Sequence, residues 1–327
     1  MAETCVELPD LCWDLIFSFL DHHQQLEAPS LVCKRFLSIA NCLRLSLTVA
    51  DPTVPFLSRL FRRFPQLKKI DLRDFHGDLN GLVHQIARSG LDLEELNVSN
   101  KRNLPLQSLS ELGSNMKNLK VLKCSWLCLQ DSDLSVIASS LPWLEELDIS
   151  YPERDDDSMH EWGFLTPHKG TVTDAGIEAL STITEEGLAG ILKKCREVRH
   201  LEVNRCDGMK NIGTDFGFCK LEVLRAQGLG INDEALAIIG KRCGGLLHFD
   251  LQGCLNVTVR GVKEVVQNCR GLREINLKYC DNVDVEIVAW MVFTRPSLRK
   301  ITPPCGFAPS EGQKNLFLRH GCIVFDG

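Results

Sequence analysis

The segment Leu272-Arg273-Glu274-Ile275-Asn276-Leu277 is one copy of a Leu-x-x-Leu-x-Leu pattern that recurs along the chain. The copies follow one another at intervals of 26, 26, 25, 54, 23, 25, 26 and 26 residues. A pattern of this kind with a period of about 20 to 29 residues is typical of leucine-rich repeats. The first positions, all Leu or Val, fall at residues 67, 93, 119, 144, 198, 221, 246, 272 and 298.

The positions within each copy alternate as a β-strand requires. In the first eight copies the fourth and sixth positions are apolar, as Ile70 and Leu72 are in the first of them. Successive side chains of a strand point to opposite faces, so the polar fifth position faces away from the core. The pattern predicts a stack of short parallel strands with one polar wall. Its fifth-position residues are Asp71, Asn97, Lys123, Asp148, Glu202, Arg225, Asp250 and Asn276.

The remainder of each repeat is expected to be a helix. Asn232 precedes two acidic residues and an apolar segment, and Thr184 and Thr258 begin equivalent segments; such residues commonly cap helix N-termini. One strand and one helix cannot bury their apolar faces alone, so neighbouring repeats must stack, and the wider helical side curves the stack. The predicted fold is an α/β solenoid with parallel strands on its concave side and helices on its convex side.

The 54-residue interval interrupts the pattern. Counting it as two intervals gives a mean period of about 25.7 residues, which predicts a degenerate repeat with an acidic loop at about residues 151–170. The loop is either a solvated insertion or a contact for a basic partner. Beyond Leu298, a strand at Ile323 predicts an atypical C-terminal capping repeat.

Composition narrows the class of protein. The 327 residues are 44% hydrophobic and 24% charged, values that exclude a disordered or fibrous chain. The net charge of -6 argues against a sequence-independent nucleic-acid binder. The apolar run Ile287 to Phe293 is too short to cross a membrane, and the N-terminus lacks a basic, apolar signal segment. We therefore expect a cytoplasmic or nuclear protein without membrane or nucleic-acid partners.

The fifteen cysteines have two interpretations. Three occupy the ninth position of the pattern, and three others each lie 11 residues before one of them. A ladder of metal or disulfide sites is one interpretation, and small buried side chains at turns and helix ends are the other. The spacing supplies no complete ligand set, which favours packing and predicts no metal or cofactor. The six residues are Cys195, Cys206, Cys243, Cys254, Cys269 and Cys280.

The first forty residues do not follow the repeat pattern, and their apolar residues are spaced as in helices. Leu11, Leu15 and Phe19 have helical spacing after Pro9-Asp10, and a second short apolar segment has a basic turn. The segments Leu8-Pro9-Asp10, Ile16 to Leu20 and Ser30 to Phe36 resemble an F-box, with Phe36 where the family usually has Trp and with Pro29 shortening the third helix. Because Cys-type leucine-rich repeats follow this F-box-like segment, the chain resembles the F-box/LRR family of substrate receptors.

The resemblance implies a domain order and a function. Residues 1–45 would be the F-box, 46–66 a linker or first degenerate repeat, and 67–327 the solenoid. In that family the F-box binds the Skp-type adaptor of a cullin-based (SCF) ubiquitin ligase, and the repeats hold the protein to be ubiquitinated for proteasomal degradation. The implied adaptor-binding residues are Leu8, Pro9, Leu15, Ile16, Phe19, Leu20, Leu31, Val32, Cys33 and Phe36.

Two alternatives accompany this interpretation. The N-terminal apolar residues could form only a cap for the solenoid, and the chain could be an interaction scaffold that recruits no ligase. The sequence holds none of the nucleophile-elbow, Walker, dinucleotide or zinc-protease motifs. We therefore expect a non-catalytic subunit that acts by bringing a substrate close to an enzyme.

The eighth position of the pattern is the candidate substrate contact, because it holds both tyrosines of the chain and one tryptophan. Aromatic and Arg side chains are the commonest interface hot spots. Alternatively, these rings merely cover the turn after the strand. The Arg and Lys residues nearby are suited to an acidic or phosphorylated segment. The predicted substrate-binding residues are Arg73, Trp126, Tyr151, Asn204, Arg205, Arg225, Gln227, Lys278 and Tyr279.

Overall fold

A computed structural model describes residues 8–20, 23–51, 57–151, 183–206, 209–213, 217 and 219–325 of the chain. These residues divide into two compact units. The first comprises residues 1–97 and 107–119, and the second comprises residues 98–106 and 120–327.

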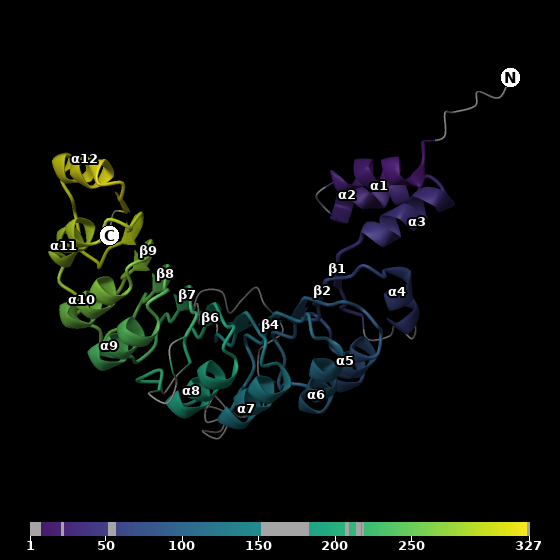
Figure 1. Ribbon diagram of the computed structural model, residues 1–327, viewed down its shortest axis with the longest axis horizontal. Coiled ribbons are helices and arrows are strands. Elements are labelled where there is room, and N and C mark those ends of the chain that lie inside the picture. The colour runs from purple at the N-terminus through teal and green to yellow at the C-terminus, as the bar shows by residue number, and fades with distance from the viewer. Residues whose placement is uncertain are drawn as a thin grey trace, which may run out of the picture. The chain divides into compact units, whose positions relative to one another are not determined.

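The first unit begins with three helices and continues as repeats (Figure 1). The strands β1, β2 and β3 pair in parallel, with Leu47 opposite Ile70 and Ile70 opposite Leu96. Residues 46–66 contain a strand and a helix, so the strand–helix pattern extends one repeat before Leu67. The elements are α1 (Asp10–Ser18), α2 (His23–Ser30), α3 (Lys34–Leu43), β1 (Ser46–Thr48), α4 (Leu57–Arg63), β2 (Lys69–Asp71), α5 (Leu79–Ala87), β3 (Glu95–Asn97) and α6 (Leu106–Asn115).

The second unit is a run of repeats whose strands pair in chain order. Within it the strands line the inner side of a curve and the helices line the outer side (Figure 1). The elements are β4 (Val121–Lys123), α7 (Asp131–Ser140), β5 (Glu146–Asp148), α8 (Glu185–Lys194), β6 (His200–Glu202), β7 (Val223–Arg225), α9 (Asp233–Arg242), β8 (His248–Asp250), α10 (Val259–Asn268), β9 (Glu274–Asn276), α11 (Ile287–Thr294), β10 (Lys300–Thr302), α12 (Glu311–Arg319) and β11 (Ile323–Val324).

The predicted α/β repeat fold is confirmed, and each half of a repeat forms for the expected reason. The central residue of each strand from β2 to β10 is buried, as Leu201 and Phe249 are. The residue two positions further along is buried as well in the copies from Leu72 to Leu277, which gives the alternation predicted from the sequence. Thr184, Asn232 and Thr258 cap α8, α9 and α10, each accepting a hydrogen bond from a backbone N–H of the first turn.

The prediction of an additional repeat in the 54-residue interval is wrong. β5 pairs directly with β6, with Leu147 opposite Leu201. β4 occupies the other edge of β5, so no strand fits between β5 and β6 in the sheet. The interval is therefore one repeat with a long insertion. The acidic segment proposed after Tyr151 and the helix start at Thr173 lie outside the described residues.

The closing repeat predicted at the C-terminus is present. β11 pairs in parallel with β10, with Lys300 opposite Ile323. Ser310 and Gln313 form a capping box at the start of α12. Among the helices of the described residues, none has the length and apolar character that crossing a membrane requires.

Candidate functional site

The three N-terminal helices have a small core of their own. Phe17, Leu26 and Ile39 are buried, and Phe36 packs against them with its ring centroid 5.1 Å from that of Phe17. The Trp13 ring lies 4.5 Å from that of Phe36. Phe36 therefore takes part in an aromatic cluster inside the helices, although the F-box resemblance implies a partner contact for this residue.

Arg35 holds the chain before α1 against α3. Its Nε lies 2.6 Å from Oδ1 of Asp10, and its guanidinium also donates to the carbonyl oxygen of Leu8. Cys33 caps α3, with its Sγ accepting from the N–H of Phe36 at 3.4 Å. The basic turn noted in the sequence thus has a structural role, which is to fix Leu8, Pro9 and Asp10 in place.

A group of large apolar side chains on these helices lies in contact with solvent, and we call it the apolar patch. Leu11, Leu15 and Phe19 are 80%, 61% and 75% exposed, and Leu31 and Val32 are 86% and 68% exposed. Exposed apolar groups in a continuous area are typical of interaction sites. The patch comprises Leu8, Leu11, Leu15, Ile16, Phe19, Leu31 and Val32.

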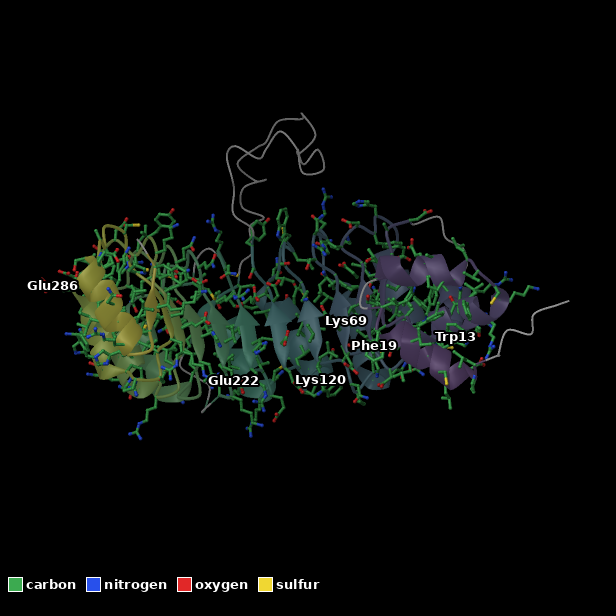
Figure 2. The ribbon with its side chains drawn as sticks, turned by 90° about the horizontal axis from the view of Figure 1, so that it is seen from above. Trp13, Phe19, Lys69, Lys120, Glu222 and Glu286 are labelled. Carbon is green, nitrogen blue, oxygen red and sulfur yellow. The ribbon has the colours of Figure 1, made fainter. Side chains whose placement is uncertain are left out.

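The predicted adaptor-binding residues divide into two groups. Leu8, Leu15, Ile16, Phe19, Leu31 and Val32 belong to the patch, and Pro9 and Cys33 are exposed beside them. Leu20 and Phe36 are half-buried against the helical core. Leu11 also belongs to the patch but is not among the predicted residues, although it has the i, i+4, i+8 spacing with Leu15 and Phe19 that places side chains on one helix face. Figure 2 labels Trp13, which belongs to the core, and Phe19, which belongs to the patch.

Other residues of the three helices contact the first repeat. Nε of Arg63 in α4 donates to Oδ1 of Asn41 in α3 at 3.2 Å. The guanidinium groups of Arg44 and Arg63 lie 5.0 and 5.3 Å from the centre of the Phe64 ring. The helices thus attach to the repeats through the end of α3, with residues that are not part of the apolar patch.

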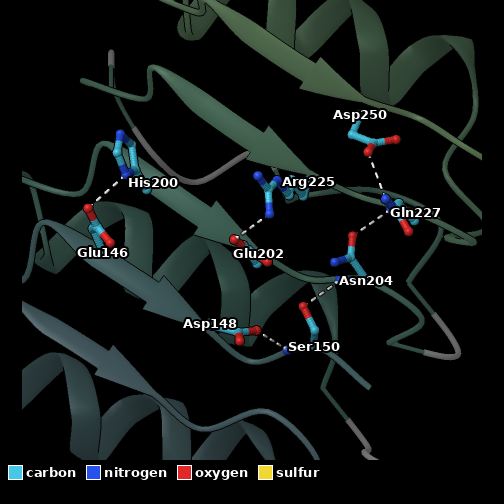
Figure 3. A network of polar contacts seen from close by, with 9 residues as sticks. All are labelled: Glu146, Asp148, Ser150, His200, Glu202, Asn204, Arg225, Gln227 and Asp250. Carbon is cyan, nitrogen blue, oxygen red and sulfur yellow. Dashed lines mark hydrogen bonds and ion pairs between the residues drawn. The ribbon is translucent and has the colours of Figure 1, made fainter. Parts of the chain in front are cut away.

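The strand wall of the second unit carries a chain of polar contacts from one repeat to the next (Figure 3). The N–H of Ser150 donates to Asp148, and the Ser150 hydroxyl accepts from the N–H of Asn204 at 3.2 Å. The Asn204 amide oxygen accepts from the N–H of Gln227, whose side chain donates to Asp250 at 2.7 Å. A network in which each group is satisfied by its neighbour holds the wall in one arrangement.

Charged groups of the wall pair across adjacent strands. Arg225 lies 3.1 Å from Glu202, and His200 lies 2.8 Å from Glu146. Burial raises the pKa of the Glu202 carboxyl above its ordinary value, although Arg225 acts in the opposite direction. Both members of each pair remain accessible on the concave side.

A hollow of about 440 Å³ lies on this wall between β7 and β10. This volume falls within the range of small-ligand or peptide side-chain sites. Its lining is mainly polar and combines hydrogen-bond donors with acceptors. The polar side chains around it are those of Asn204, Arg225, Gln227, His248, Asp250, Glu274, Asn276, Lys300 and Thr302.

The eighth position of the repeats forms a rim at the end of the strands. The N–H groups of Trp126 and Arg205 donate to the carbonyl oxygens of Ser150 and Gln227 in the next repeat, so the ladder of hydrogen bonds continues into the turn. The φ angles of Asn100, Trp126, Arg205 and Tyr279 lie between 55° and 64°. A non-glycine residue in this left-handed region costs about 1–2 kcal/mol.

The predicted substrate-binding residues are mostly brought together. Trp126, Tyr151, Arg205 and Tyr279 lie on the rim, with Trp126 and Tyr279 44% and 49% exposed. Asn204, Arg225, Gln227 and Lys278 lie beside them on the same unit, and Nζ of Lys278 is 5.0 Å from the centre of the Tyr279 ring. Arg73 belongs to the first unit, where it pairs with Asp71 at 2.8 Å. His200 and His248, which occupy the third position of the pattern, also line the strand wall and are not among the predicted residues.

The six repeat cysteines are buried, as the packing interpretation predicts. Cys254 and Cys280 donate to the carbonyl oxygens of Ala226 and Leu251 in the preceding repeat, at 3.1 and 3.0 Å. Burial raises the pKa of the Cys195, Cys254 and Cys269 thiols to about 12. In the described part of the chain, no three His, Cys, Asp or Glu side chains are grouped as metal ligands.

Comparison with known proteins supports the fold. No protein-family model matches the chain. A chain in the crystal structure of the Rad7 and Elc1 complex in yeast is similar over 97% of this chain and 93% of its own length, with 15% identity and a TM-score of 0.51.

Two further structures have lower scores. The TLR13–ssRNA13 complex matches 86% of this chain and 41% of its own, with 13% identity and a TM-score of 0.43. The leucine-rich repeat-containing protein LegL7 from Legionella pneumophila matches 85% of this chain and 97% of its own, with 14% identity and a TM-score of 0.41. The fold and the polar strand wall define a leucine-rich-repeat architecture, a solenoid whose curvature creates an extended concave surface.

Proposed function

We propose that the protein is the substrate-recognition subunit of an SCF-type ubiquitin ligase. In this proposal α1–α3 bind a Skp-type adaptor, and through it a cullin, while the strand wall and rim of the repeats bind the protein to be ubiquitinated. The observation that carries the proposal is the apolar patch. Residues that match the F-box pattern expose their large side chains, although the same helices have a core that buries Phe17 and Ile39.

The exposure of the patch favours docking over a capping role. A cap would bury these side chains against the repeats, yet the contacts with the first repeat use Asn41 and Arg44. Leu11, Phe19 and Leu31 are exposed to water, and a partner that covered them would gain roughly 1.5–3 kcal/mol of burial free energy for each side chain. An apolar groove on an adaptor would recover that free energy.

The proposed role needs no catalytic side chain. A receptor raises the effective concentration of substrate lysines near the enzyme that transfers ubiquitin. The pairs on the wall, such as Arg225 with Glu202, are suited to binding polar side chains of a protein. The similar chain in the Rad7 and Elc1 structure comes from a complex of two proteins, which agrees with a role in an assembly. We place that role in the cytoplasm or nucleus.

Co-purification with a Skp-type adaptor tests the proposal. We expect Leu15→Asp combined with Phe19→Asp to abolish adaptor capture, because each charge would enter an apolar interface at a cost of several kcal/mol. The repeats should stay folded, because both residues are exposed.

The matched control is Leu255→Asp combined with Leu318→Asp. These residues are 54% and 55% exposed and belong to the second unit. The control variant should bind the adaptor as the unaltered chain does. If the unaltered chain captures no adaptor, the protein is an interaction scaffold that does not recruit a ligase. If the patch variant captures the adaptor normally, the apolar patch is not the adaptor site and the F-box assignment is wrong.

A further inference from the structure

Two glycines interrupt the rim between Arg205 and Tyr279. Gly228 and Gly253 occupy the eighth position in the repeats of β7 and β8, where the other repeats of the second unit carry a side chain. Parallel strands lie about 4.8 Å apart, so the backbone positions of Arg205 and Tyr279 are roughly 14 Å apart. We call this stretch of bare backbone the rim gap.

Backbone conformation does not by itself account for the two glycines. Gly228 and Gly253 have φ angles of 66° and 73°, in the left-handed region that favours glycine. At the same position Trp126, Arg205 and Tyr279 adopt φ angles of 64°, 55° and 59°. The rim therefore accepts large side chains at this conformation.

Steric crowding does not require glycine at position 253 either. A Cβ atom there would lie 3.7 Å from the nearest atoms, the Cα and N of Gly228, which is an ordinary contact. At Gly228 the nearest atom would be Cγ of the Arg205 side chain, at 3.2 Å. A side chain at position 253 would thus fit against its neighbours, and glycine leaves the rim without one there. We call the part of the rim gap at the two glycines the passage.

The passage adjoins the polar hollow of the strand wall. Gln227, which precedes Gly228, lines the hollow, as does Asn204, which precedes Arg205. The floor beyond is formed by β7, β8 and β9. An extended chain that crossed the rim at the two glycines would enter the hollow directly.

The charges at the passage favour an anion. Arg205 flanks one side of the gap, and Lys278 flanks the other against the ring of Tyr279. Two acidic groups that line the hollow already face donors or cations. Asp250 accepts from Gln227, and Glu274 lies 3.6 Å from His248 and 3.7 Å from Lys300. An incoming carboxylate or phosphate would meet two rim cations.

We propose that the rim gap admits an extended peptide segment of the target protein, and that an acidic or phosphorylated side chain of this segment lies between Arg205 and Lys278. The inference rests on the part of the proposed function in which the repeats bind a protein. It is independent of the adaptor, because the apolar patch belongs to the first unit and the rim gap to the second.

The test uses the full chain and three pools of fluorescein-labelled decapeptides. The pools share randomised flanks without Lys or Arg and carry a fixed central Ser, Glu or phosphoserine. We expect the unaltered chain to bind the Glu or phosphoserine pool at least about tenfold more tightly than the Ser pool. Comparison of the two anionic pools identifies which source of negative charge the site prefers.

Substitutions then locate the binding site. Gly253→Trp should weaken binding of the preferred pool about tenfold. Gly253→Asn has a short side chain suited to the left-handed region, and it should change the affinity for that pool by less than about twofold. Arg205→Gln adds no bulk and should bring the anionic pool to within about threefold of the Ser pool. The matched control is Gly90→Trp, because Gly90 has the same φ of 73°, has no atom within 4 Å of an added Cβ, and lies in the first unit.

Three results would overturn the inference. The first is equal binding, or no binding, of all three pools by the unaltered chain. The second is unchanged peptide binding by both Gly253→Trp and Arg205→Gln. The third is an equal loss of binding in Gly90→Trp and Gly253→Trp. None of these outcomes bears on adaptor capture, so failure of this inference and failure of the ligase proposal are distinguishable.

Discussion

The carboxylate of Asp131 accepts two hydrogen bonds from Thr184, one from its backbone N–H at 2.8 Å and one from its hydroxyl at 2.6 Å. Asp233 and Thr258 form the same pair at 2.8 and 2.6 Å. In each case the Asp begins one helix and the Thr caps the next. The recurrence means that α7 and α8 pack as adjacent repeats do, although Thr184 lies 53 positions after Asp131 in the sequence.

This pairing predicts that the insertion is dispensable for folding. Deleting residues 154–180 would join Glu153 to Ser181 and leave eight residues between Asp148 and Thr184, where seven separate Asp250 from Thr258. Because β5 already pairs with β6, we expect the midpoint of thermal unfolding to change by no more than a few degrees. Circular dichroism melting measures it. Loss of the cooperative transition would mean that the insertion contributes to the core.

The two Asp–Thr pairs also depend on glycines that lie three residues after each Thr. A Cβ added at Gly187 or Gly261 would collide with the carboxylate of Asp131 or Asp233. We therefore expect Gly187→Ala to lower the free energy of unfolding by about 1–3 kcal/mol, although alanine is the better helix former.

Gly190 of the same helix provides the control for that substitution. Nothing lies within 4 Å of a Cβ added there, so Gly190→Ala should raise the free energy of unfolding by about 0.5–1 kcal/mol. Urea unfolding of the two variants gives both values. A stabilising Gly187→Ala would contradict the proposed contact between the carboxylate and the glycine.

The contact of Arg35 with Asp10 predicts a local effect of its removal. The two side chains are 36% and 67% exposed, and exposed ion pairs contribute little to global stability. We expect Arg35→Ala to leave thermal unfolding nearly unchanged but to speed amide hydrogen exchange in α1, since Leu8 and Asp10 lose their link to α3. Lys34→Ala is the matched control, and equal exchange in both variants would count against this role.

Trp126 carries a cost in stability that a glycine would avoid. Its φ of 64° lies in the left-handed region. We expect Trp126→Gly to raise the free energy of unfolding by about 1 kcal/mol and to weaken target binding, because the exposed ring is removed. Trp126→Ala loses the ring but keeps the backbone strain, so it should weaken binding without the gain. Denaturant unfolding of both variants distinguishes strain from packing, and a strongly destabilised Trp126→Gly would show that the ring serves the fold.

The buried thiols predict a loss of stability at alkaline pH. Burial raises the pKa of Cys195 and Cys269 to about 12 from an ordinary value of 9.0. Between these values the unfolded chain releases protons that the folded chain retains, so the stabilising contribution is complete below pH 9.0 and is lost as the pH rises toward about 12. Urea unfolding at pH 8 and pH 10 should record the decline, and replacing both residues with Ala should reduce it.

Periodicity revealed much of the fold because the eight copies that begin at Leu67 to Leu272 share the same alternation of apolar and polar residues. The polar fifth position beside buried residues such as Leu147 and Phe249 identified the strands, and Thr184, Asn232 and Thr258 identified helix starts. The sequence left residues 46–66 as a linker or a first degenerate repeat because the copy of the pattern there is incomplete, and the pairing of β1 with β2 identifies the strand at Ser46. The extra repeat was wrongly inferred because residue spacing does not distinguish an insertion from a repeat.

The sequence by itself determined the architecture and the rim positions of residues such as Trp126, Arg205 and Tyr279. These depend on alternation along the chain and on a regular period, which are local properties. Only the tertiary structure decided that Phe36 joins a core while Leu11 remains exposed, and that β5 lies beside β6. Those outcomes depend on which surfaces meet when distant segments pack, and the chemistry of a single segment does not specify its neighbours.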